Sequence, residues 1–277
     1  MQTPPSATSD ERLPRTPADQ GLSGLPPGSQ LDTYDVRQYS RWGVLGVWAA
    51  AALPMAGLAW VVAPAVAGHG ASERQFVLTL LVALTAGLIW QAVLVLLLVW
   101  RERRDLSWTS LRNRLWLRAP STSTRRGGRL WWWVLVYALA LGALDMLPFG
   151  PTGPSDRDFG LFLGSPVGQA TFHHAWGLYL LVAVELAFNT FLGEELLFRG
   201  LLLPRMRRAF GRGDWVVNGV LFGFYHLHEP WVIPNAIVTG FLCAYPTRRY
   251  RSAWMGICIH SVEAVFFLVI LLPIVAS

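Results

Sequence analysis

The 277-residue sequence contains no lysine, only two cysteines and few charged side chains of either sign. Charged residues make up 14% of the chain, against about 25% in an average soluble domain, whereas hydrophobic residues make up 53%. This balance excludes a typical soluble domain. Cys243 and Cys258 both lie in apolar segments. They form neither a disulfide framework nor a spacing of metal ligands, so we interpret them as inert core residues.

All 23 basic residues are arginine, and the formal net charge is +6. Because the arginines flank apolar runs, they indicate membrane topology, and we expect a lipid bilayer and no nucleic acid as partner. The absence of lysine, together with 14 tryptophans and many Ala, Gly and Pro residues, suggests a GC-rich genome and therefore a bacterial source.

Apolar runs of a length suited to crossing a membrane recur along the chain. A helix needs about 20 apolar residues to span a bilayer. Two of the runs are shorter than this and are punctuated by prolines, which is typical of broken or tilted helices. We therefore predict an all-α, polytopic transmembrane helical bundle with about seven spans, over residues 42–67, 76–100, 131–148, 174–198, 215–228, 231–245 and 253–275.

The chain divides into three regions. Residues 1–36 are rich in Pro, Ser, Thr and Gly and lack the apolar core of a signal peptide, so we predict a disordered cytoplasmic tail. Residues 37–173 contain the first transmembrane segments. They include an arginine-rich stretch at 101–129, part of which we predict to be an amphipathic surface helix, and an exposed loop at 149–172. Residues 174–277 form the core that carries the chemistry.

The distribution of arginines predicts the orientation. With the N-terminus in the cytoplasm and seven alternating segments, 21 of the 23 arginines fall inside, and only Arg74 and Arg157 fall outside. The positive-inside rule therefore favours an integral protein of the bacterial cytoplasmic membrane with a cytoplasmic N-terminus.

The fourth apolar run contains two adjacent acids and an arginine, Glu194, Glu195 and Arg199. A charge inside hydrocarbon costs a few kcal/mol or more, so such residues usually face a cavity and act there. Glu195 and Arg199 are four residues apart, which suits an ion pair on one helix face. Glu194 is turned by about 100° and is free to face a cavity. The alternative is that all three end the helix at the membrane interface.

Two histidines, His226 and His260, lie inside apolar segments, whereas His228 stands at a segment end and is expected to be interfacial. A glutamate and a histidine together can activate a water molecule as general base while another histidine supports an oxyanion, as peptide hydrolysis requires. Alternatively, Glu194, His226 and His260 can ligate zinc. There is no His-Glu-x-x-His or Gly-x-Ser-x-Gly motif.

Three motifs together resemble the CPBP intramembrane proteases, a family that includes type II CAAX prenyl endopeptidases and bacteriocin-processing or immunity proteins. The resemblance covers residues 175–270. It rests on Glu194-Glu195-x-x-x-Arg199, on Phe222-x-x-x-His226, and on His260 preceded by Gly240, Tyr245 and Ser252. The resemblance implies that Glu194 and His226 activate water and that His260 helps to form the oxyanion site. It also implies that Glu195, Arg199 and Phe222 support them and that Gly240, Tyr245 and Ser252 pack.

One position departs from the family. Asn usually stands four residues after the last histidine, and this chain has Ala264 there. The resemblance implies an intramembrane endopeptidase that cleaves a membrane-associated peptide or protein near the cytoplasmic face. Ala264 favours the alternative of a catalytically impaired scaffold or immunity protein of the same fold. A proton-coupled carrier that uses Glu185 and Glu194 is a third hypothesis.

Overall fold

The computed structural model describes residues 36–147 and 150–277. Apart from Val36, the tail predicted at residues 1–36 lies outside these ranges. The described residues form helices without a β-strand, and a lone bridge joins Ser121 and Arg126. The predicted all-α class is therefore confirmed.

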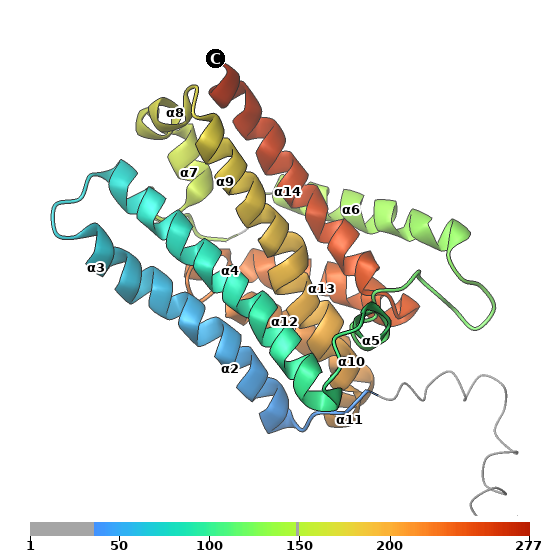
Figure 1. Cartoon of the computed structure of the whole chain (residues 1–277). Helices are drawn as coiled ribbons and strands as arrows, with labels where there is room; N and C mark the ends of the chain where they lie inside the picture. The colour runs from blue at the N-terminus through green and yellow to red at the C-terminus, as the bar shows by residue number, and fades with distance from the viewer. Residues whose placement is uncertain (1–35, 148–149) are drawn as a thin grey trace, which may run out of the picture. The chain divides into compact units, whose positions relative to one another are not determined.

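Four helical stretches are long and apolar enough to cross a membrane (Figure 1). The first runs through α2 (Arg41–Gly57), the π-helical η2 (Leu58–Val62) and α3 (Ala63–Ala67), and the second is α4 (Glu73–Arg103). The third begins with α9 (Trp176–Ala187) and continues to Arg205, and the fourth is α14 (Ala253–Ala276). These stretches pack side by side as one bundle.

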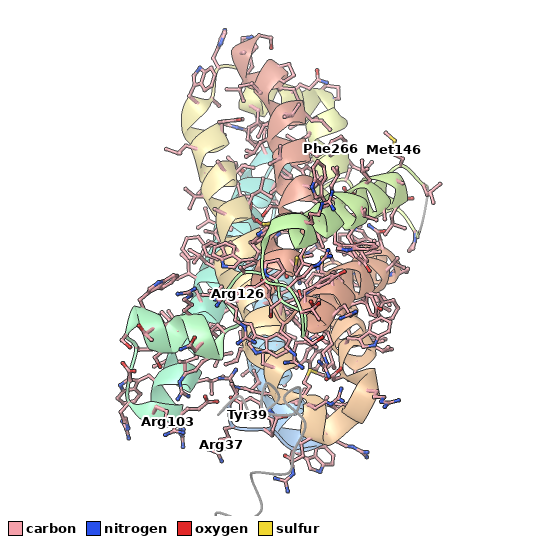
Figure 2. The ribbon with its side chains drawn as sticks, turned by 90° about the vertical axis from the view of Figure 1, so that its right-hand side faces the viewer. Arg37, Tyr39, Arg103, Arg126, Met146 and Phe266 are labelled. Carbon is pink, nitrogen blue, oxygen red and sulfur yellow. The ribbon has the colours of Figure 1, made fainter. Side chains whose placement is uncertain are left out.

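The three other predicted spans are helical but shorter: α6 (Trp132–Asp145), α12 (Asp214–Tyr225) and α13 (Ile233–Tyr250). Helix α6 packs on both α13 and α14, and it runs across α14 in Figure 2. The connections contain short helices, namely η3 (Gly128–Trp131), α11 (Arg207–Phe210), η6 (Gly211–Gly213) and η7 (Pro230–Val232).

Glycines set the close packing of α12 against α13. A Cβ atom added to Gly240 would lie 2.6 Å from the carbonyl oxygen of Gly219. One added to Gly223 would lie 2.2 Å from a side-chain carbon of Ile237. The two backbones approach this closely because these positions carry no side chain. The approach fixes the turn after α12, where His226 lies.

The loop predicted at residues 149–172 is partly wrong, because its second half is helical. It forms α7 (Phe159–Gly164) and α8 (Pro166–Phe172), whose N-termini are capped by the side chains of Asp158 and Ser165. The aromatic side chains of Phe162 and Phe172 are fully buried in a core shared with α4, α9 and α14. Capping and apolar burial outweigh the glycine and proline content on which the prediction rested.

The surface helix predicted within the arginine-rich stretch corresponds to α5 (Trp108–Arg114), after which the chain turns inward. Leu115 and Leu117 are buried in the main core instead of facing a membrane surface. Gly200 permits this, since a Cβ there would come within 3.3 Å of the Leu115 carbonyl oxygen.

A buried ion cluster fastens the arginine-rich end of the bundle, where Arg37, Tyr39 and Arg103 are labelled in Figure 2. Arg205, the last residue of α10 (Leu203–Arg205), is fully buried and donates two hydrogen bonds of 2.8 Å to the carboxylate of Glu102. Arg114 adds a third hydrogen bond to the same carboxylate at 3.0 Å. The cluster thereby ties α4, α5 and α10 together.

We predict that Gly240→Ala destabilises the fold by about 1–3 kcal/mol, because the new Cβ meets backbone that cannot retreat without separating α12 from α13. The matched control is Gly142→Ala in α6, where an added Cβ meets nothing within 4 Å. That substitution should be neutral or stabilise by about 0.5–1 kcal/mol. Thermal unfolding midpoints of the two variants in detergent, taken at one scan rate, check this. Equal midpoints would show that the close approach carries no energetic weight.

Candidate active site

The two adjacent acids lie between two π-helical segments of one long helix. After α9 the chain enters η4 (Phe188–Gly193), passes Glu194 and Glu195, and continues as η5 (Leu196–Leu202). Stretches of π-helix are rare and are frequent at functional sites, because they redirect side chains relative to a regular helix. Glu194 and Glu195 are both buried, at 2% and 0% exposure.

Arg199 is fully buried and compensated on several sides. Its guanidinium lies 2.8 Å from the carboxylate of Glu195, as the sequence predicted, and donates to the carbonyl oxygen of Gly240 at 3.3 Å. It also stands over the ring of Phe222, 4.1 Å from the centroid. An uncompensated charge here would be strongly destabilising, so these groups hold the helix end, α12 and α13 to one another.

His260 of α14 lies between two carboxylates. Its Nδ1 is 3.1 Å from Glu195, and its Nε2 is 3.2 Å from Glu263, one turn further along the same helix. An ionised carboxylate only accepts hydrogen bonds, so both ring nitrogens must carry a proton for both contacts to be favourable. In this arrangement His260 is an imidazolium, a group that donates from both nitrogens.

His226, at the C-terminal end of α12, has the opposite arrangement. Its Nδ1 lies 3.0 Å from the carbonyl oxygen of Phe222. A carbonyl oxygen only accepts, so Nδ1 carries the proton and Nε2 keeps its lone pair in the neutral ring. His226 is therefore set up to accept a proton at Nε2.

Phe222 brings the two histidines together. Its ring meets that of His226 edge to face at a centroid distance of 5.1 Å, and that of His260 at 5.7 Å. The residue is 1% exposed. The histidines predicted from separate segments thus share one aromatic neighbour, and His226 and His260 are close enough to interact electrostatically.

Glu194 has polar partners that sequence reasoning missed. The amide of Asn189, in the orientation that satisfies both groups, donates to the two carboxylate oxygens of Glu194 at 2.8 and 3.0 Å. The hydroxyl of Tyr225 also contacts Glu194 and receives a 2.6 Å hydrogen bond from Gln91 of α4. His260 lies within electrostatic range. The sequence held one signal for this group, because Gln91 is the single side-chain amide of the apolar run 76–100.

The expectation that His228 is interfacial is wrong. The residue is 7% exposed, and its ring stacks on that of His226 at a centroid distance of 5.4 Å. It also contacts the ring of Tyr225. The turn after α12 places His228 inside the protein, where its Nδ1 has no hydrogen-bond partner.

The zinc alternative does not fit this arrangement. Within residues 36–147 and 150–277, no group of three His, Cys, Asp or Glu side chains is placed to hold a metal ion. Both nitrogens of His260 face carboxylates, and Nδ1 of His226 faces a carbonyl. His260 with two protons offers no lone pair to a metal. We therefore derive the chemistry from the side chains alone.

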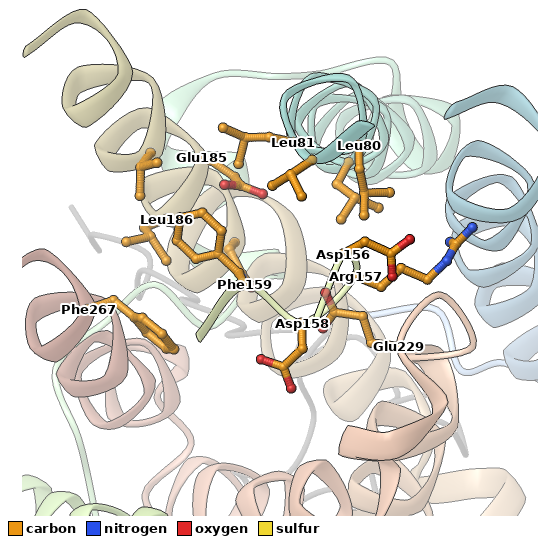
Figure 3. A pocket seen from close by; sticks show the side chains of 14 residues that line it. Leu80, Leu81, Asp156, Arg157, Asp158, Phe159, Glu185, Leu186, Glu229 and Phe267 are labelled. Atoms are coloured by element: carbon orange, nitrogen blue, oxygen red, sulfur yellow. The ribbon is translucent and has the colours of Figure 1, made fainter. Parts of the chain in front are cut away.

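A cavity of about 170 Å³ adjoins the site at Asn189 (Figure 3). Glu185, Glu229 and Asp158 bring carboxylates to its walls. Arg157, next to Asp158 in the sequence, points its guanidinium away from these carboxylates. The guanidinium donates to the carbonyl oxygen of Ala59 and lies over the ring of Trp60. Glu185, one of the acids of the carrier hypothesis, thus lines this adjoining cavity together with Asn189.

The supporting and packing positions differ in their surroundings. Gly240 lies in the contact of α12 with α13, and its carbonyl accepts from Arg199. Ser252 is buried and donates to the carbonyl oxygen of Arg118. Tyr245 is 41% exposed and meets the ring of Trp215 edge to face. Ala264 is buried at 8% exposure and brings no polar atom to the site.

Comparison with known proteins identifies the part of the chain that holds this site. A family model described as "Type II CAAX prenyl endopeptidase Rce1-like" matches residues 175–266, which contain Glu194, His226 and His260. No curated protein and no solved structure matches the chain. The match and the four long apolar helices make this an integral membrane protein. Residues 175–266 are therefore a domain of the type II CAAX prenyl endopeptidase Rce1-like family, the group that the three sequence motifs predicted.

Proposed function

We propose that this protein is an intramembrane endopeptidase that hydrolyses a peptide bond with water activated by Glu194 and His226. The observation that carries the proposal is the pair of histidines in complementary states beside a buried acid. His226 keeps a lone pair at Nε2, and His260 donates from both nitrogens. Hydrolysis needs a base and an electrophile of this kind in one place.

The attacking water is placed between Glu194 and His226. As its oxygen bonds to the scissile carbonyl carbon, its proton passes to the base formed by these two residues. The hydrogen bonds from Asn189 and Tyr225 fix the direction of the Glu194 carboxylate. The same proton then goes to the nitrogen of the departing amine, which completes the hydrolysis with the base regenerated.

His260 supports the oxyanion that forms on the carbonyl oxygen. A fixed donor directed at developing charge is most effective where water is excluded, and His260 is 4% exposed. Glu195 holds the ring of His260 at Nδ1, and Arg199 in turn holds the Glu195 carboxylate. The supporting roles of Glu195, Arg199 and Phe222 follow from these contacts.

The substrate we propose is a membrane-associated peptide or protein, cut near the cytoplasmic face of a bacterial membrane. The arginines at the end of the bundle near Arg205 support a cytoplasmic N-terminus by the positive-inside rule. The family name refers to prenylated CAAX peptides. A prenylated CAAX peptide and an apolar peptide without a prenyl group are therefore both to be assayed.

A second candidate is a catalytically impaired scaffold or immunity protein of the same fold. The observation that favours it is Ala264, which cannot donate a hydrogen bond at the position where the family usually has Asn. Losing one oxyanion donor costs about 100- to 1000-fold in rate. Direct cleavage assays separate the two candidates.

We predict that Glu194→Gln and His226→Ala each lower cleavage by about 100- to 10,000-fold, because each removes part of the base. The measurement is the appearance of peptide products from protein reconstituted in liposomes. The matched control is Glu185→Gln, which neutralises an acid of the same helix in the adjoining cavity and should stay within about threefold of wild type. Proton-coupled uptake without cleavage, lost in Glu185→Gln, would support the carrier instead.

We further predict that chelators leave cleavage unchanged, because His260 faces carboxylates at both nitrogens and offers no lone pair to a metal. The enzyme is assayed after treatment with 1,10-phenanthroline and dialysis, and metal content is measured in parallel. Loss of activity that added zinc restores would contradict the assignment of His260 as a hydrogen-bond donor.

A further inference from the structure

The carboxylate of Glu263 contacts Nε2 of His260. Its Oε2 lies 3.2 Å from Nε2, while Nδ1 is already held by Glu195. Glu263 stands three positions after His260 in α14. On an α-helix, positions i and i+3 are neighbours, and here the two side chains meet.

The contact lies on the accessible side of the site. The side chain of Glu263 is 23% exposed, against 6% for His260 and 0% for Glu195. Nδ1 of His260 points into the buried ion pair, whereas Nε2 meets the more exposed carboxylate. Glu263 therefore covers the donor of His260 that lies outside the buried ion pair.

Charge balance explains why this carboxylate is stable there. Arg199, Glu195, His260 and Glu263 form a chain of alternating charges, each in contact with the next. A neutral carbonyl that replaced Glu263 would leave the chain with an excess positive charge. An oxyanion in the same place would restore the balance, because it brings the charge that Glu263 had supplied.

We propose that Glu263 is a positioning residue that acts as an internal competitor: it occupies the oxyanion position at Nε2 of His260 and is displaced by the substrate. This rests on the proposed function and adds a step to it. The displacement costs the same free energy in the substrate complex and in the transition state, because Glu263 has left Nε2 in both. The exchange therefore opposes substrate binding and leaves the chemical step largely unaffected.

The test is Glu263→Gln, which keeps the size of the side chain and removes its charge. With a peptide that wild type cleaves, KM should fall by about 10- to 100-fold, the value of one charge-assisted hydrogen bond, and kcat should stay within about threefold. The matched control, Glu73→Gln at the start of α4, removes one charge far from the site and should change neither constant. A fall in kcat of tenfold or more with KM unchanged would overturn the proposal, because Glu263 would then take part in the chemistry.

A second readout does not depend on cleavage. Nitrogen NMR of protein with isotope-labelled histidine should give protonated signals for both ring nitrogens of His260, with His260→Gln assigning them. In Glu263→Gln the Nε2 signal should move and the Nδ1 signal should change little. An Nε2 signal that is identical in wild type and Glu263→Gln would overturn the proposal. If wild type and Glu263→Gln both fail to cleave any peptide, the proposed function fails, and the NMR comparison still decides the role of Glu263.

Discussion

The buried guanidinium of Arg199 is the interaction on which the rest of the site depends. It lies in a segment that is apolar enough to cross a membrane, where an uncompensated charge is too costly to keep. Its compensation comes from different parts of the chain: Glu195 on its own helix, the Gly240 carbonyl of α13 and the ring of Phe222 in α12. Satisfying one charge therefore fixes three elements relative to one another.

The contacts that set the protonation of the two histidines come from the neighbours of Arg199. Glu195 balances Arg199 and, with the same carboxylate, holds Nδ1 of His260. Gly256 permits this contact, because a Cβ there would lie 2.4 Å from the Glu195 carboxylate and would push α14 away. Phe222, in turn, packs on Arg199 with its face and accepts from His226 with its backbone carbonyl. The contacts of both histidines are thus set by neighbours of one arginine.

The sequence predicted the parts of this arrangement that depend on residue spacing or on the free-energy cost of burying polar groups in a membrane. A four-residue interval paired Glu195 with Arg199, and the expense of polar groups in apolar runs singled out Glu194, His226 and His260. Contacts that depend on local distortion were beyond it. Asn189 reaches Glu194 because the segment between them is a π-helix, which has a wider turn than an α-helix. No residue type in the sequence predicts that π-helix. His228 and α8 were misjudged for a related reason: histidine, glycine and proline content reports local preference, whereas burial comes from distant helices.

The contact between Glu263 and His260 gives Ala264 a second consequence, beyond the loss of an oxyanion donor. A resting site with a free imidazolium and no second donor would hold an unbalanced charge in an apolar surrounding. Glu263 removes that imbalance, because its carboxylate contacts Nε2 of His260. A donor beside Nε2 would stabilise the same carboxylate and make it harder for a substrate to displace. Alanine at position 264 leaves the carboxylate with one strong partner instead of two, so the absence of the second donor weakens the resting contact as well as the oxyanion site.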